Sequence, residues 1–289
     1  MYHIGRINEL QILKEIEYGL LLGEAGNSIL LPRRFVEDQH LVGDAIEVFV
    51  CYDSEDRLVA TTQTPLIAVG EAAILKVKDL TQVGAFLDWG LDKDLFLPFS
   101  EQTSELKIGE SVVVYCYVDK SDRISASMRL DRYLDKTSHD FKEGQKVSLV
   151  VAGKTELGFK VVVDRTHWGI LYSDETFQRL EYGSETVGFL KKIRPDGKLD
   201  VTLTQPGHQA AVEDVGPRIL ALLAEEGGTL KITDKTDPEI IYRLFGVSKK
   251  KFKMALGGLY KAKKIQIGDN EIKLAVSPAE DPLKPQTKT

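Results

Sequence analysis

The sequence has only two cysteines, Cys51 and Cys116, among 289 residues. Both lie in apolar runs typical of strands, FVCY and VYCY, but they differ by one residue in their spacing from the glycine before each run. Two cysteines at unmatched positions favour neither a disulfide nor a metal site. We therefore expect two ordinary strand residues.

Long apolar runs are also missing. No stretch approaches the roughly 20 apolar residues that span a membrane. The first residues, MYHIGRINEL, lack the charged and apolar regions of a signal peptide. The sequence therefore predicts a cytoplasmic protein without a membrane partner.

Motifs of enzyme chemistry are absent as well. We find no phosphate loop, no nucleophile elbow and no defensible pair of catalytic carboxylates. Five histidines occur singly, without the spacing of metal ligands: His3, His40, His139, His167 and His208. The sequence thus predicts no enzyme, no metal and no cofactor. A nuclease site assembled from separate loops is the catalytic alternative that stays open.

The charge is uneven along the chain. The net charge is −6 overall, and residues 1–64 alone carry −6, whereas residues 208–289 carry +3. Binding to a polyanion should therefore depend mainly on the C-terminal half.

Internal repetition is the strongest feature that is present. One frame of turn residues recurs three times, with a period of about 65 to 74 residues, and matching apolar runs fill each interval. The frame consists of Gly5, Gly19, Pro32, Gly43 and Arg57, then Gly70, Gly84, Pro98, Gly109 and Arg123, then Gly144, Gly158, Tyr172, Gly183 and Lys198. This period is too long for a solenoid unit, so each repeat should be a small domain.

Each repeat is predicted to hold five short strands, which suits a small Greek-key barrel. In the second repeat Val112, Val114, Cys116 and Val118 alternate with other residues, so we expect them on the core face of the fourth strand. The predicted domains span residues 1–64, 65–134 and 141–207. The polar segment 131–140 is interpreted as a linker, with at most a helical turn.

The period changes after Gly207. Asp237-Pro238-Glu239 and Ser248 are helix-start signals, and Gly246 is a stop signal. Three helices followed by a hairpin around Gly268-Asp269-Asn270 predict an α+β winged helix over 208–276. The proline-rich tail 277–289 is predicted to be disordered.

The second repeat resembles a known domain. Its succession G-A-F-L, D-L-F-L-P-F-S-E, I-G-E-S-V-V-V-Y and V-D-K-S-D-R-I-S-A-S-M is similar to the ribosomal-protein S-one RNA-binding domain, a five-stranded OB-fold barrel. The first and third repeats match mainly through the glycine frame and the fourth strand. Three such barrels before a winged helix resemble the bacterial conserved virulence factor B family. The resemblance implies a mainly β, multidomain RNA-binding regulator, with a link to virulence regulation.

The resemblance also implies which positions contact RNA. Those of them that carry an aromatic or a basic residue in this sequence hold Tyr18, Arg57, Phe86, Arg123, Lys160, Tyr172 and Lys198. Aromatic residues would stack on bases, and cations would neutralise phosphates. The alternatives are packing of the aromatic rings and solvated turn charges. Asp53 and Asp119 are interpreted as turn residues, and Trp89 and Trp168 as packing or ligand-contacting residues.

A basic segment is the clearest electrostatic feature. Ser248–Lys264 contains seven lysines and no acid. The lysines predicted to bind phosphate are Lys249, Lys250, Lys251, Lys253 and Lys261. Four of them crowd a helix start, where the dipole disfavours cations. This cost favours a binding role over the alternative of a solubilising face.

We expect a non-enzymatic protein that binds single-stranded RNA multivalently through its barrels and its winged helix. Two alternatives stay open. The acidic first repeat fits a scaffold that meets basic partners, such as ribosomal or RNA-processing proteins. The winged helix by itself could bind DNA.

Overall fold

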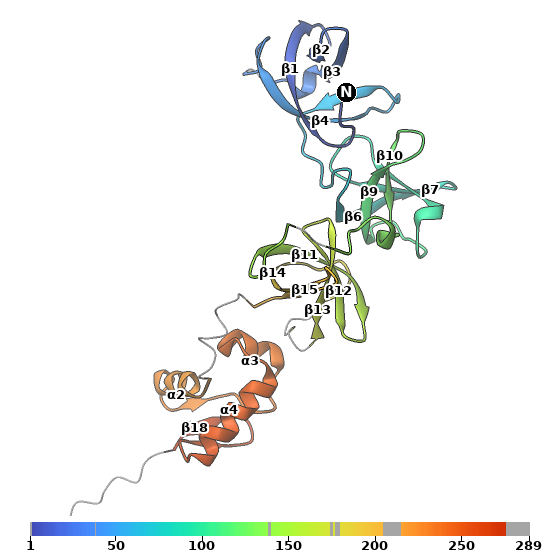
Figure 1. The fold of residues 1–289 in the computed structure, drawn as a ribbon. Coiled ribbons are helices and arrows are strands. Elements are labelled where there is room, and N and C mark those ends of the chain that lie inside the picture. Colours follow the sequence, from blue (N-terminus) through green and yellow to red (C-terminus); the bar gives the residue numbers. More distant parts are fainter. Residues whose placement is uncertain are drawn as a thin grey trace, which may run out of the picture. The chain divides into compact units, whose positions relative to one another are not determined.

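The structure is a computed structural model that describes residues 2–37, 39–137, 140–173, 176, 180–204 and 215–275. The predicted tail 277–289, His139 and His208 lie outside these residues. The chain divides into two compact units (Figure 1): Met1–Leu171 with Leu180–Val201, and Tyr172–Arg179 with Thr202–Thr289. No helix in the described ranges is long and apolar enough to cross a membrane.

The first unit contains three closed five-stranded barrels. The first barrel consists of β1 (Ile7–Ile16), β2 (Gly19–Glu24), β3 (Asn27–Pro32), β4 (Ala45–Tyr52) and β5 (Leu58–Thr61). The second consists of β6 (Ala72–Leu80), β7 (Gly84–Asp88), β8 (Leu95–Pro98), β9 (Ser111–Val118) and β10 (Ile124–Ser127). The third consists of β11 (Lys146–Thr155), β12 (Gly158–Val163), β13 (His167–Tyr172), β14 (Glu185–Ile193) and β15 (Leu199–Thr202).

All three barrels share one topology. In each, the first three strands are neighbours, the fifth pairs with the third, and the fourth closes the barrel onto the first. The pairing of third and fifth strands is parallel, as at Leu30 with Val59 and at Phe96 with Ser125. The predicted repeat of five-stranded barrels is confirmed. Every strand falls within its predicted domain range, while the exact domain boundaries remain predictions.

The glycine frame has a steric cause. Gly19 and Gly84 begin the second strands of their barrels with φ of +146° and +158°. A Cβ atom would come within 1.9 Å of the Leu31 carbonyl oxygen at Gly19, and within 2.4 Å of the Leu97 carbonyl oxygen at Gly84. The third strand thus approaches the second so closely that only glycine fits.

The predicted core face of β9 is correct for three of its four residues. Val112, Val114 and Cys116 are buried, but Val118 is only half-buried. Val113 was expected on the outer face and is nevertheless buried, at 1% exposure. The reason is a neighbouring domain, because Val113 belongs to an apolar cluster that includes Val150 of the third barrel.

The segment 131–140 is not a simple polar linker. A 3-10 turn, η3 (Leu130–Arg132), overlaps its start, as the interpretation allowed, but Leu134 and the adjoining Leu130 are buried. Their side chains join the cluster between the second and third barrels. Leu134 and the adjoining Leu130 thus pack between two barrels, a contact that the polar composition of the segment did not predict.

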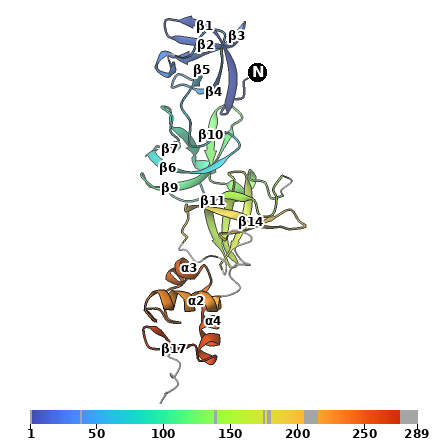
Figure 2. The ribbon, with the colours of Figure 1, turned by 90° about the vertical axis from the view of Figure 1, so that its left-hand side faces the viewer.

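The second unit is a small α+β domain (Figure 2). It contains α2 (Val215–Glu225), β16 (Thr229–Leu230), α3 (Pro238–Phe245), α4 (Lys249–Lys261), β17 (Ile265–Ile267) and β18 (Ile272–Leu274). The three described helices contact one another, and the described strands form a sheet in the order β16-β18-β17. The predicted three helices and hairpin are confirmed.

The residues predicted to begin and end helices in this unit also do so in the structure. The Asp237 carboxylate accepts the backbone N–H of Glu239, and Pro238 begins α3. Gly246 ends α3 with φ of +67°. The Ser248 hydroxyl accepts the N–H of Lys251 at the start of α4. A three-residue turn therefore joins α3 to α4, as in a helix-turn-helix.

Candidate nucleic-acid interface

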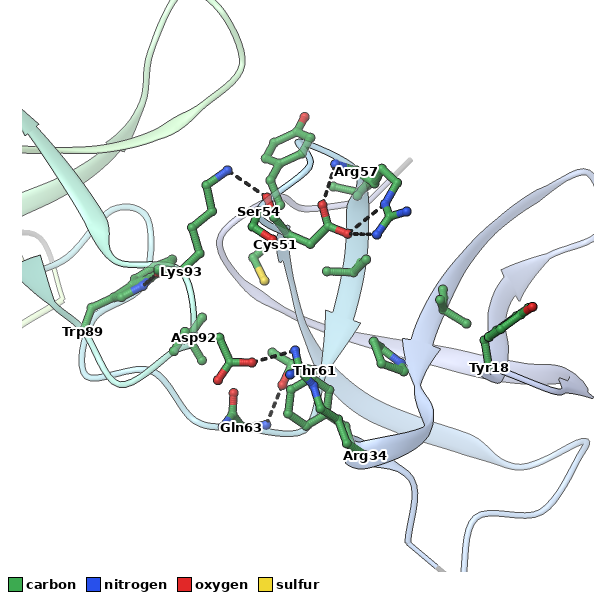
Figure 3. Close-up of a pocket in the computed structure, with 18 residues that line it drawn as sticks. Tyr18, Arg34, Cys51, Ser54, Arg57, Thr61, Gln63, Trp89, Asp92 and Lys93 are labelled. Carbon is green, nitrogen blue, oxygen red and sulfur yellow. Dashed lines mark hydrogen bonds and ion pairs between the residues drawn. The ribbon is translucent and has the colours of Figure 1, made fainter. Parts of the chain in front are cut away.

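The first barrel carries a cleft of about 870 Å³ (Figure 3). The lining residues from the first barrel itself include Tyr18 in the β1–β2 turn, Pro32 in β3 and Arg57 in the turn before β5. Tyr18 is 69% exposed, so its ring is free to contact a ligand. The cleft therefore brings together two of the predicted RNA-binding residues, Tyr18 and Arg57.

Arg57 is already engaged by neighbouring acids. Its guanidinium lies 2.7 Å from an oxygen of Asp53 and 2.8 Å from one of Glu55. The other oxygen of Asp53 accepts the backbone N–H groups of Glu55 and Arg57, both at 2.9 Å. Asp53 thus shapes the turn and orients Arg57, as its interpretation as a turn residue predicts.

These contacts change the acidity of Asp53. Burial alone would raise the pKa of this carboxyl, but the hydrogen bonds from Arg57 and Glu55 outweigh it and lower the pKa overall. The carboxylate therefore stays charged and keeps much of the Arg57 charge neutralised. A phosphate would have to share Arg57 with this partner.

The second barrel carries a cleft of about 530 Å³. Phe86 on β7 and Phe96 on β8 are register partners, with ring centroids 5.3 Å apart. Both are half-buried, so each ring keeps an exposed part. Arg123 lines the same cleft and lies 3.3 Å from Asp119, whose carboxylate shapes the turn as Asp53 does. Two aromatic rings and a cation thus share one surface.

The third barrel arranges its predicted residues differently. The Lys160 ammonium lies 3.9 Å from the centroid of the Trp168 ring and 2.6 Å from Asp131. Lys198 pairs with Asp196 at 2.8 Å. Tyr172 ends β13 and is half-buried. Each predicted cation of the barrels therefore has a nearby carboxylate.

Trp89 has a packing role. It is 4% exposed, its ring meets Phe49 edge to face at 5.8 Å, and its indole N–H donates to the carbonyl of Lys93. Trp89 nevertheless lines both clefts.

Neither cysteine offers a reactive thiolate. Cys51 and Cys116 are free and buried. Burial raises the pKa of the Cys51 thiol to about 11 and raises that of Cys116 as well. Among the described residues, no group of three or more His, Cys, Asp or Glu side chains is placed to hold a metal ion.

The lysines of α4 lie on its outer side. The helix buries Phe252, Leu256 and Leu259, whereas Lys250, Lys251, Lys253 and Lys261 are exposed. Lys249 donates to the carbonyl of Lys235, and Lys253 lies 3.3 Å from Asp234. Within the described part of the chain, Lys250, Lys251 and Lys261 form no ion pair. These three charges are therefore available to a ligand.

Lys93 and Phe96 are among the cleft residues that the sequence did not predict. Phe96 could have been found, because Leu95 and Leu97 are core residues and the alternation of a strand then turns Phe96 outward. Lys93 gave no such signal, since it lies between Asp92 and Asp94 in an ordinary polar loop.

Comparison with known proteins identifies the domain types. The family model described as "S1 domain" matches residues 4–63 and 69–129, and the one described as "CvfB-like winged helix domain" matches 217–274. These matches support binding of nucleic acid by this chain. The third barrel has the same strand order as the two matched ones.

Several relatives match over nearly the whole chain. "Uncharacterized protein YitL" of Bacillus subtilis is 26% identical over 270 residues, which is 90% of each chain. "Conserved virulence factor B" of Staphylococcus epidermidis is 26% identical over 283 residues, which is 94% of each chain. A crystal structure of a multidomain protein with nucleic acid binding domains from Streptococcus pneumoniae is 24% identical, covers 94% of this chain and 98% of its own, and has a TM-score of 0.43.

Proposed function

We propose that this chain, a homologue of the bacterial proteins named Conserved virulence factor B, is a non-catalytic regulator that binds single-stranded RNA through several domains at once. The surface of the second barrel is the observation that carries this proposal. Phe86 and Phe96 expose ring area beside Arg123 on one cleft. Unpaired bases can stack on such rings, and a nearby cation can meet the phosphate.

Several weak sites would act together. The predicted cations of the barrels are shared with carboxylates, so each barrel alone should bind weakly. Sites on one chain raise one another's effective concentration when a single strand reaches them. Together with the free lysines of α4, this arrangement favours a long single strand over a short one.

A second candidate is duplex DNA binding by the C-terminal unit. The helix-turn-helix formed by α3 and α4 favours it, because such a motif places its second helix in the major groove. The lysines on the outer side of α4 would then contact the duplex backbone. A third alternative is a scaffold role for the acidic first barrel. This barrel would then bind ribosomal or RNA-processing proteins and would not contact nucleic acid itself.

Replacing Phe86 with alanine should weaken the binding of single-stranded RNA with little loss of stability. One stacked base contributes about 1–3 kcal/mol, which corresponds to a loss of roughly 5- to 150-fold in affinity. A buried phenylalanine would instead cost about 3–5 kcal/mol of stability. A fluorescence titration with labelled RNA, together with a thermal melt, measures both quantities.

Phe99→Ala is the matched control for this experiment. Phe99 is 57% exposed in η2 (Phe99–Glu101) of the same barrel and does not line the cleft. Its removal should leave the affinity unchanged. An unchanged affinity of the Phe86→Ala variant, or an equal loss in both variants, would contradict the stacking role.

A further inference from the structure

We propose that the ligand faces of the first and second barrels form one continuous groove, and that a single RNA strand crosses it over Lys93. The two barrels would then bind as one site and not as two modules joined by a linker. This inference rests on the proposed binding of single-stranded RNA, and it adds the path of the strand and the residue at its centre.

Each barrel supplies a wall of the other barrel's cleft. The cleft of the first barrel is lined on one side by Trp89, Leu91 and Asp92, which belong to the β7–β8 loop of the second barrel. The cleft of the second barrel is lined in turn by Ser54 and Asp56, from the β4–β5 turn of the first. Both clefts share Cys51, Tyr52, Ser54, Trp89 and Lys93. They are therefore adjoining parts of one groove.

The groove is built on a shared core. A single apolar cluster contains Phe49 and Cys51 of the first barrel together with the core of the second. The Gly5 carbonyl accepts the backbone N–H of Val69 at 2.8 Å, which adds a polar tie between the barrels. The groove is thus formed before a ligand arrives, and this reduces the ordering cost of binding.

Lys93 lines both clefts and so lies where they meet. Figure 3 shows it among the residues that line the cleft of the first barrel. Its ammonium group donates to the carbonyl of Asp53 at 2.8 Å and to the carboxylate of Asp56 at 2.6 Å. An ammonium group has three N–H donors. Within the described residues two donors have partners, so the third can bind a phosphate of a strand that passes over the junction.

Away from Lys93, the charges of the groove indicate which part of the strand faces it. Its lining is balanced, with four basic and four acidic residues: Arg34, Arg57, Lys93 and Arg123, and Asp53, Asp56, Asp92 and Asp94. Such a lining gives no broad attraction for phosphate. Aromatic rings from both barrels, Tyr18 and Phe86, line it as well. The bases should therefore face the groove and most phosphates the solvent.

The test compares two lengths of RNA on the full chain. A strand of about 5 nucleotides fits one barrel face, whereas one of about 16 can cross both. Lys93→Gln should lower the affinity for the long strand at least about fivefold, because it removes a charge-assisted hydrogen bond to phosphate. The affinity for the short strand should change less than about twofold, since it can occupy one face without reaching the junction.

Two control variants separate the phosphate contact from other effects. Asp56→Asn removes a carboxylate from the groove and from Lys93 but keeps the lysine, so it should raise the affinity for the long strand and not lower it. Lys107→Gln removes an exposed lysine of the second barrel that lines neither cleft, and should have no effect. Thermal melts check that all variants stay folded.

Three results would overturn the inference while leaving RNA binding in place. They are no loss with Lys93→Gln, an equal loss for both lengths, and a loss reproduced by Asp56→Asn. If the wild-type chain binds neither RNA, the proposed function fails and the inference fails with it.

Discussion

Phe252→Ala should destabilise the C-terminal unit by about 3–5 kcal/mol, the usual cost of removing a buried phenylalanine. Phe252 is fully buried on the inner side of α4, where its ring stacks on Phe245 with centroids 5.1 Å apart. A domain of this size has a total stability of about 5–15 kcal/mol, so the loss is a large fraction of it.

The two units can be followed by separate signals in one unfolding experiment. Both tryptophans, Trp89 and Trp168, lie in the first unit, whereas the described α-helices all lie in the second. Circular dichroism at the helix band should show the loss, while tryptophan fluorescence should be unchanged. Tyr260→Ala, which removes a 56% exposed ring from the same helix, is the control and should cost little. A small effect of Phe252→Ala would contradict this packing of α4.

Replacing Lys249, Lys250, Lys251 and Lys253 with glutamine should lower the salt dependence of RNA binding. Each lost phosphate contact reduces the slope of log affinity against log salt by about 0.7 for a single strand. If two or more of the four lysines contact phosphate, the slope should fall by at least about 1.4. Glutamine keeps helix propensity, and fewer cations at the positive end of the helix should leave the fold intact or slightly more stable.

A second quadruple variant controls for net charge. Lys14, Lys107, Lys142 and Lys146 are exposed lysines of the three barrels. Their replacement by glutamine removes the same charge from the chain but should leave the slope almost unchanged. Equal slopes for the wild-type chain and the α4 variant would show that the α4 lysines are a solvated surface.

The barrels were predictable because their constraints are local and repeated. Gly19 and Gly84 occupy equivalent positions where a neighbouring carbonyl excludes a side chain, so the same residue recurs at the same spacing. The helix caps at Asp237 and Ser248 are equally local, since each satisfies backbone N–H groups within three residues. Such signals depend little on the rest of the chain.

Contacts between domains were not predictable in the same way. Val113 is on the outer side of its strand, and Leu134 lies in a polar segment, yet both are buried by the neighbouring barrel. A single sequence shows which residues are apolar but not which surface another domain covers. The groove between the first two barrels was missed for this reason, and with it Lys93.

The sequence named some residues that line the clefts but did not predict what surrounds them. Phe86 and Tyr18 do lie on clefts, as the resemblance implied. The cations Arg57 and Arg123 have carboxylate partners four residues away, which were visible in the sequence as turn residues but not as competitors for phosphate. Their roles in binding remain predictions.

The measurement that tests the account most directly is a competition titration with the full chain. A labelled single-stranded RNA of about 20 nucleotides is displaced by unlabelled single-stranded RNA, by duplex RNA and by duplex DNA of the same sequence. The account predicts that single-stranded RNA competes at least about tenfold better than either duplex at moderate salt, because only unpaired bases can stack in the clefts of the barrels. Stronger competition by duplex DNA, or the absence of binding by single-stranded RNA, would contradict it.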